Sequence, residues 1–239
     1  NPGDMAIIAF NADGNDDIAI VVFEDVPAST TIYLTDNELD GAGGFVDSNE
    51  GELTWVTGAL IPAGTVITFN NISTGTSATV SHGTITDGNG FNLTGGGDAA
   101  FFYLGTDVDT PLVFLAGIQN EANNFGDLTG SGLTEGTTFV TFTTSGNPDG
   151  GVYSGPRNSE TSFANYLALI GDPANWTTEN SDGTLVLPFD TTSFIEATTA
   201  TPVITVSGAI TGLDYFEGNG PSSEDTFTVS GTNLTGDIS

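Results

Sequence analysis

Short apolar runs rich in Val, Ile, Phe and Thr alternate along the chain with clusters of Gly, Asp and Asn. Runs of this kind, bounded by turn-forming residues, are typical of β-strands. Strands are predicted near residues 5–10, 17–23, 30–34, 53–56, 65–69, 79–85, 99–104, 112–118, 137–142 and 184–187. Such short strands, separated by frequent turns, predict an all-β fold, namely a β-sandwich of about ten strands.

One segment, residues 162–170, has a helical period. Its apolar side chains recur at i, i+3, i+4 and i+7, at Phe163, Tyr166, Leu167 and Ile170. Thr161 or Ser162 can cap the start of this helix, and Gly171 can end it. We expect one short helix that packs across an open edge or end of the sandwich, where it shields unpaired strand groups.

The C-terminal part of the chain is organised differently. Residues 191–201 are rich in Thr and Ala and are predicted to be a linker after a sandwich domain at 1–190. Two alternating runs follow, at 202–206 and 226–230. Because two strands cannot close a sandwich, residues 202–239 are interpreted as a β-hairpin. It is either the start of an immunoglobulin-like domain, incomplete at Ser239, or a strand-exchange segment.

Charge narrows the classes of partner. One Lys or Arg against 31 Asp plus Glu gives a formal net charge of −30 at pH 7. Such a surface repels phosphates, so we expect no nucleic-acid binding. Anionic membranes are excluded on the same ground, and no apolar run approaches the roughly 20 residues that span a bilayer. The chain is 37% hydrophobic and 10% aromatic, which indicates a folded protein rather than a disordered acidic tail.

The reactive side chains argue against an enzyme. The sequence has no Cys, one His (His82) and one Arg (Arg157). A catalytic triad or a histidine-bound zinc would depend on His82 alone. A carboxylate pair for glycoside hydrolysis needs a cleft that the pattern does not indicate. We expect no catalysis, and we expect Arg157 to pair with carboxylates. Asn1 in place of an initiator Met indicates a processed or excised chain.

The densest polar cluster is the loop at residues 11–17. Oxygen-bearing side chains at alternating positions around a Gly can converge on calcium, which takes about six to eight oxygen ligands. The predicted ligands are Asn11, Asp13, Asn15 and Asp17, with Asp16 as a substitute. The loop is not an EF-hand, because its twelfth position is Val22 instead of Glu. The alternative is an acidic turn, since Asp and Asn tolerate turn geometry.

A second acidic cluster contains Asp36, Glu38 and Asp40, followed by Asp47, Glu50 and Glu52. Crowded carboxylates repel one another unless a cation or a proton compensates them, and no Lys or Arg is near in sequence. Asp36, Glu38 and Asp40 are therefore predicted as calcium ligands as well. The alternative is a mobile, solvated loop whose charges are screened by salt.

Three stretches carry a resemblance to a known family: NPGDMAIIAFNADG at 1–14, YLTDNE at 33–38 and FANYLAL at 163–169. They resemble the N-terminal β-module of large secreted or cell-surface multidomain proteins of Bacteroidota and cyanobacteria. Those proteins carry further immunoglobulin-like repeats, sometimes a nuclease or phosphatase domain, and a C-terminal sorting or calcium-binding region. Residues 202–239 are similar to the start of such a repeat. The resemblance implies architecture and export, and it implies no catalytic residue.

These observations predict an extracellular structural module of a bacterial surface or filament protein, stabilised by calcium. Calcium bound to the folded state would order the acidic loops and reduce self-repulsion. The C-terminal strands would pair with another copy of the chain, forming a homopolymer, or with other surface proteins or glycans. The alternative is an accessory module of a secreted hydrolase or nuclease that binds a ligand or glycan through Trp55, Tyr153 or Trp176.

Overall fold

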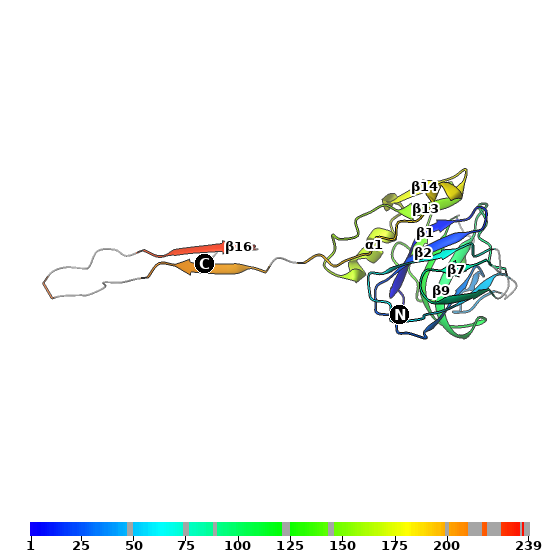
Figure 1. The fold of residues 1–239 in the computed structure, drawn as a ribbon, viewed down its shortest axis with the longest axis horizontal. Helices are drawn as coiled ribbons and strands as arrows, with labels where there is room; N and C mark the ends of the chain where they lie inside the picture. Colours follow the sequence, from blue (N-terminus) through cyan, green and yellow to red (C-terminus); the bar gives the residue numbers. More distant parts are fainter. Residues whose placement is uncertain are drawn as a thin grey trace. The chain divides into compact units, whose positions relative to one another are not determined.

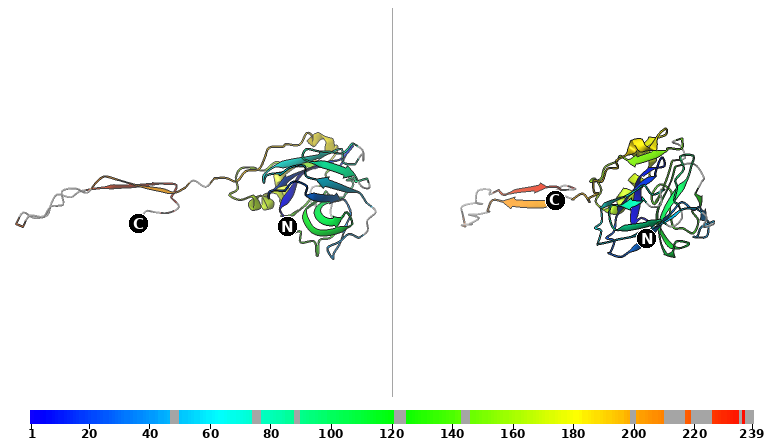
Figure 2. Two further views of the ribbon diagram at one scale, coloured as in Figure 1. Left: turned by 60° about the horizontal axis from the view of Figure 1, so that its bottom comes forward. Right: turned by 45° about the vertical axis from the view of Figure 1, so that its right-hand side comes forward.

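The computed structural model describes residues 1–46, 50–73, 77–87, 90–120, 125–142, 146–198, 201–209, 217–218, 226–234 and 236. The chain divides into two compact units, Asn1–Ala197 and Thr198–Ser239. The first unit is a sandwich of two six-stranded sheets, which confirms the predicted all-β class (Figures 1 and 2). A helix long and apolar enough to cross a membrane is not found in the described segments.

The first sheet contains β1 (Met5–Asn11), β2 (Asp17–Val22), β6 (Val66–Asn70), β7 (Thr79–Val80), β13 (Gly150–Tyr153) and β14 (Trp176–Glu179). Its strand order is β14-β13-β1-β2-β6-β7, with antiparallel pairing throughout.

The second sheet contains β3 (Thr31–Thr35), β5 (Glu52–Val56), β8 (Thr84–Asp87), β9 (Ala99–Asp107), β10 (Thr110–Gln119) and β12 (Phe139–Thr141). Its order is β12-β10-β9-β3-β5-β8, in which β10 and β12 are parallel and the other pairs antiparallel. Two short strands, β4 (Leu39–Asp40) and β11 (Gly126–Asp127), pair with each other in parallel.

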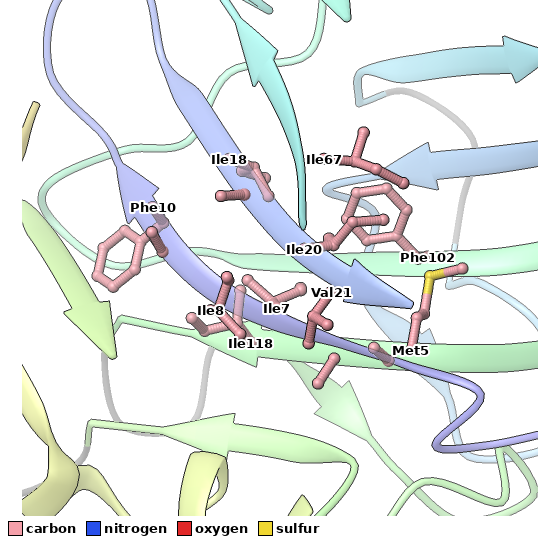
Figure 3. Packing of buried hydrophobic residues seen from close by; sticks show 14 of the residues in the cluster. Met5, Ile7, Ile8, Phe10, Ile18, Ile20, Val21, Ile67, Phe102 and Ile118 are labelled. Atoms are coloured by element: carbon pink, nitrogen blue, oxygen red, sulfur yellow. The ribbon is translucent and has the colours of Figure 1, made fainter. Parts of the chain in front are cut away.

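Apolar side chains from both sheets meet in one core. All residues of β1 and β2 are buried, so these strands are apolar on both faces. Figure 3 shows Met5 and Ile8 of β1 in the same interior as Phe102 of β9 and Ile118 of β10. The neighbouring residue Phe101 points to the other face of its sheet, where a second apolar cluster forms. The central strands are therefore held on both sides, and they form a rigid frame.

The predicted helix at 162–170 is confirmed, as the short 3₁₀ segment η1 (Phe163–Asn165) followed by α1 (Tyr166–Ile170). It ends at Gly171, as expected, but Ser162 makes no side-chain capping bond. Instead, the carboxylate of Glu196 accepts a hydrogen bond from the amide of Phe163 at 3.0 Å. The helix contacts the central strand β1, and its Ile170 carbonyl also accepts a hydrogen bond from Trp176 of the edge strand β14 at 2.7 Å. It therefore covers a face of the first sheet, where Tyr166 is buried.

Two strand predictions are wrong. Residues 79–85 form two strands, β7 and β8, which belong to different sheets, because the chain turns at Gly83 with φ +90°. Residues 184–187 lie mainly in the 3₁₀ segment η3 (Gly183–Val186), whose first turn is capped by the Asp182 side chain. A further 3₁₀ segment is η2 (Pro173–Asn175).

Strands β13 and β14 were not predicted from the pattern. The first of them begins with two glycines, Gly150 and Gly151, which carry no strand signal. A Cβ atom at Gly151 would lie 2.8 Å from the ring of Phe10, so the missing side chain makes room for that ring in the neighbouring strand. The alternation of apolar and polar residues is missing from β13 because Gly151 has to leave room for the ring of Phe10.

The sandwich unit continues to Ala197, past the boundary predicted at residue 190. We call residues 190–197 the strap. Phe194 anchors the strap in the core with 1% of its surface exposed, and its amide donates to the carbonyl of Gly64 at 2.9 Å. At the other side of the strap, the amide of Ile195 donates to the carbonyl of Arg157 at 2.8 Å. The composition of this segment is typical of a linker, but one aromatic side chain places it in the sandwich.

Arg157 fastens the same strap. Its Nη1 donates to the backbone carbonyls of Asp190 and Thr192 at 3.0 and 2.7 Å. Its guanidinium carbon lies 5.1 Å from the ring centroid of Phe194. The expected pairing with a carboxylate is present, but the Nη2 to Asp190 Oδ2 distance is 3.7 Å and Asp190 is exposed. The carbonyl bonds and the ring contact therefore contribute more than this ion pair.

The second unit contains the antiparallel hairpin of β15 (Val203–Ser207) and β16 (Thr228–Thr232). Val206 is paired with Val229, and Ile204 lies two residues before Val206 on the same face. These three side chains are exposed, Ile204 by 59%. The described hairpin therefore has an apolar face that the rest of its own unit does not bury.

Candidate functional site

The sandwich gathers its acidic side chains at one end. β1 ends at this end with Asn11, and β2 begins there with Asp17, because the two strands are antiparallel. In the second sheet, Asp36 follows β3 and Asp98 precedes β9 at the same end. We call this region the acidic end. Antiparallel pairing within each sheet, together with the packing of the two sheets, brings these distant residues together.

Three carboxylates at the acidic end hold three consecutive backbone amides. Asp36 Oδ2 accepts from the amide of Asn92 at 2.8 Å, and Asp16 Oδ2 accepts from the amide of Leu93 at 2.7 Å. Asp98 Oδ2 accepts from the amide of Thr94 at 3.2 Å. The side chains come from three separate turns of the two sheets. The loop at residues 92–94 is therefore a tie between the two layers.

A cavity of about 220 Å³ opens beside this loop, lined by Asp36, Glu50, Gly51, Gly90, Asn92, Thr94 and Asp98. Asp36 is 4% exposed, and its second carboxylate oxygen, Oδ1, is buried without a hydrogen-bond partner in the described structure. The amide of Glu50 donates to the Asn37 side chain at 3.3 Å, which fixes the backbone on that side of the cavity. The cavity thus combines three carboxylates with other oxygen-bearing groups.

Burial makes these carboxyl groups unusually weak acids. It raises the pKa of Asp36 to about 7, although the amide of Asn92 opposes the shift, and Asp98 and Glu50 add repulsion. Burial likewise raises the pKa of Asp16 to about 7, with repulsion from Asp17 and Asp98. It raises the pKa of Asp98 to about 6, with a contribution from Glu38. Near neutral pH this cluster holds protons or requires another positive partner.

The loop predicted as the first calcium site is closed by hydrogen bonds to the protein. The side chain of Asn11 donates to Asp17 Oδ2 at 2.9 Å and accepts from the amide of Asp13 at 3.0 Å. Asp13 Oδ2 accepts from the amide of Gly183 at 2.7 Å. These bonds agree with the alternative of an acidic turn. Calcium binding by this loop stays a prediction.

The remaining members of that loop face residue 71. Asp17 Oδ1 accepts from the amide of Asn71 at 3.0 Å, and the amide nitrogen of the Asn15 side chain donates to Asn71 Oδ1 at 3.2 Å. Asp16 was only a substitute in the prediction, yet it is buried, as Asn11 and Asp17 are, and its carboxylate binds the amide of Leu93 in the loop before the second sheet's β9. Its left-handed conformation, with φ 44°, turns it away from the alternating pattern.

The second predicted cluster is divided between different environments. Asp36 lines the cavity, and Glu38 lies close enough to Asp98 to raise its pKa. Asp40 is exposed, and its Oδ1 accepts from the amides of Ala42 and Gly44 at 2.7 and 2.9 Å, which lowers its pKa. The predicted member Asp47 lies outside the described residues.

Glu52, the last residue of that cluster, starts strand β5 and lies apart from the cavity lining. Burial raises its pKa to about 7, and the carboxylates of Asp109 and Asp107 add to the shift. Asp107 ends strand β9 and Asp109 follows it, so both residues lie far from Glu52 in the sequence. The neighbours that shift the pKa of Glu52 are therefore not the acidic residues that precede it in the sequence.

Asp98 and Asn92 were missed by the sequence analysis. The available signal was the run Gly95-Gly96-Gly97 directly before Asp98 and strand β9. A glycine run allows a tight return of the chain, and Thr94 donates from its amide to Asp98 across this run. In the described ranges, no group of three or more His, Cys, Asp or Glu side chains is arranged to hold a metal ion.

The aromatic residues of the glycan-binding alternative are inside the core. Trp55 is 1% exposed and Trp176 is 8% exposed, and Tyr153 is buried as well. Trp55 Nε1 donates to the carbonyl of His82 at 2.6 Å, and Trp176 Nε1 donates to the carbonyl of Ile170 at 2.7 Å. Binding of a glycan by stacking on one of these rings requires an exposed ring face, and in this structure the three rings are buried among other side chains.

Comparison with known proteins gives no relative: no protein-family model, no curated protein and no solved structure matches this chain.

Proposed function

We propose that this chain is an extracellular structural module of a bacterial surface or filament protein and that calcium stabilises it. One observation carries the proposal: Asp16, Asp36 and Asp98 hold the backbone of a loop that ties the two sheets together. Side chains used in this way maintain a frame. In this proposal the acidic residues have no catalytic role, and the chain is not an enzyme.

The charge balance supports a stabilising cation. Arg157 is the one Lys or Arg of the chain, and its guanidinium group is bound to the strap. The acidic end therefore draws on no basic side chain. Calcium prefers carboxylate and carbonyl oxygens, and extracellular modules bind it with dissociation constants of about 10⁻⁴ to 10⁻³ M. Affinities of that order suit a calcium-rich medium outside the cell.

Thermal unfolding of the full chain in calcium chloride and in chelator tests this function. Calcium at about one hundred times its dissociation constant should stabilise the folded state by about 2.7 kcal/mol. For a chain of this size, that raises the melting temperature by about 5–10 °C. Magnesium chloride at the same concentration and ionic strength is the control. An unchanged melting temperature in calcium would remove calcium from the proposed function.

The hairpin of the second unit supports assembly with other copies. Ile204, Val206 and Val229 present an exposed apolar face, and a two-stranded ribbon is at best marginally stable in water. Addition of these strands to a sheet of a neighbouring copy would bury that face and supply further main-chain hydrogen bonds. A head-to-tail contact of this kind that does not close produces a filament.

Electron microscopy and light scattering of the full chain in calcium test assembly. We expect filaments or large oligomers that Ile204→Asp and Val206→Asp abolish, since a charge on the apolar face opposes its burial. Thr205→Asp is the matched control, because it adds the same charge to the opposite face of β15. Monomers at high protein concentration in calcium would contradict the filament half of the proposal.

A further inference from the structure

The cavity at the acidic end is lined by Asp36, and one carboxylate oxygen of this residue has no hydrogen-bond partner in the described structure. Asp36 is 4% exposed; its Oδ2 accepts from the amide of Asn92, whereas its Oδ1 is buried with no hydrogen bond in the described structure. A buried acceptor of this kind costs about 1–3 kcal/mol when it stays unsatisfied. A partner from solution would remove that cost.

The chemistry of the cavity lining indicates the kind of partner. Asp36, Glu50 and Asp98 supply carboxylates, and the lining also contains Asn92 and Thr94. Neither Cys nor His is among the lining residues, so the soft and borderline ligands of zinc and copper are missing from it. A set of oxygen donors of this composition suits a hard divalent cation, and a cavity of about 220 Å³ leaves room for its water ligands.

The charge around the cavity favours a cation over a neutral ligand. Glu38, Asp16 and Asp36 each lie near enough to Asp98 for their carboxylates to repel it. The amino group of Asn1 is paired with Asp4, and Arg157 is bound to the strap. The positive charges of the described chain are therefore used elsewhere, and the negative potential of the cavity is uncompensated.

We propose that Asp36, Glu50 and Asp98 bind one calcium ion in this cavity, with Asn92, Thr94 and water completing its coordination. This inference rests on the proposed calcium-stabilised function and names its site. Binding would bring the three carboxylates closer together than they lie in this structure. Because Asp36 and Asp98 also hold the amides of residues 92 and 94, the bound ion stiffens the tie between the two sheets.

The assignment differs from the linear clusters of the sequence. Asp36 is shared with the predicted set, whereas Asp98 follows it by more than sixty positions in the chain, and Glu50 lies between them. No residue of the loop at 11–17 is among the lining residues of the cavity. Asp16 of that loop lies nearby, where its carboxylate accepts from the amide of Leu93. The site therefore belongs to the second sheet and the loop before β9.

Calorimetric titration of the full chain with calcium chloride tests the assignment. Asp36→Asn, Asp98→Asn and Glu50→Gln each remove one carboxylate and keep the side-chain shape. Each should weaken binding by about tenfold or more, the scale on which ligand charge tunes calcium sites. The control is Glu24→Gln, which removes one exposed charge beyond the other end of β2. It should bind calcium like the unaltered chain.

Near-ultraviolet circular dichroism in chelator shows whether each variant is folded. If Asp36→Asn fails to fold, Asp98→Asn and Glu50→Gln carry the test, because their carboxylates are less central to the loop. Binding of calcium to all folded variants with the affinity of the unaltered chain would overturn the assignment. So would the absence of any calcium binding by the unaltered chain.

The two proposals fail in different ways. If calcium raises the melting temperature of the unaltered chain and of all three variants equally, the site assignment is wrong and the calcium-stabilised function stands. If calcium raises the melting temperature of the unaltered chain and raises that of the three variants less, both proposals stand, because stabilisation follows the affinity for the folded state.

Discussion

The carboxylate of Asp16 accepts a hydrogen bond from the amide of Leu93 at 2.7 Å, although 77 positions separate the two residues. Asp16 precedes β2 of the first sheet, and Leu93 lies in the loop before β9 of the second. Asp16 is 2% exposed, so its charge is removed from water to make this contact. The acidic residues of this protein thus have individual structural tasks that its net charge conceals.

Replacing Asp16 tests the strength of this contact. Asp16→Ala loses the acceptor and places Ala at φ 44°, which favours Asp, Asn or Gly. We expect a loss of about 2 kcal/mol or more in the free energy of unfolding. Asp16→Asn keeps an acceptor oxygen and tolerates the same φ, so its loss should be about 1 kcal/mol or less. Urea unfolding at pH 7 measures both values, and equal losses for Ala and Asn would contradict the assigned role.

The raised pKa values predict an unusual pH dependence in chelator. Asp16 and Asp36 have pKa values of about 7 and Asp98 of about 6 in the folded chain, above the ordinary value of 3.8. Between pH 4 and 7 the folded state therefore binds more protons than the unfolded state, and stability falls as pH rises. The melting temperature in chelator should be higher at pH 5 than at pH 8.

A double variant isolates this effect. Asp36→Asn with Asp98→Asn removes two of the titrating groups, so the decrease in melting temperature between pH 5 and 8 should become smaller. Asp40, whose pKa is lowered, contributes its pH dependence at lower pH, so Asp40→Asn should leave this decrease unchanged. Ionic strength is held constant throughout. A melting temperature that rises from pH 5 to pH 8 in the unaltered chain would show that these groups do not control stability.

Gly51 tests the shape of the cavity without changing its charge. A Cβ atom at Gly51 would lie 2.0 Å from the Cα of Phe91, so Gly51→Ala must displace the loop that carries Asn92. We expect a loss of about 1–3 kcal/mol in stability, as for other overpacked sites, together with weaker calcium binding. Gly96→Ala is the control, because no atom lies within 4 Å of its added methyl group. Equal stability of the two variants, measured by urea unfolding, would contradict this packing.

Arg157 provides a test of charge against geometry. Arg157→Lys keeps the positive charge but loses the planar group that reaches the carbonyls of Asp190 and Thr192, so we expect a loss of about 1–2 kcal/mol. Asp190→Asn removes only the exposed partner at 3.7 Å and should cost less than about 0.5 kcal/mol. Thermal and urea unfolding give both values. A larger loss for Asp190→Asn than for Arg157→Lys would mean that the ion pair is the dominant contact.

Local pattern was a good guide wherever strands are long or helical spacing is clear. β1, β2, β6, β9 and β10 were predicted from alternating or continuous apolar runs, and the helix at residues 162–170 from its period. The glycine-rich β13 was not predicted, since Gly151 serves the ring of Phe10 in another strand. Phe194 had no periodic neighbours, so its segment was interpreted as a linker although it is buried.

The amino-acid sequence by itself determined the all-β class, the excess of negative charge and the shortage of basic partners, because these depend on composition and on spacing over a few residues. Only the tertiary structure decided which carboxylates meet. Asp36 joins Asp98 rather than Asp40, since antiparallel pairing places the end of β3 beside the start of β9. The two aspartates also differ in burial, since Asp40 is exposed to water whereas Asp36 is buried in the sandwich.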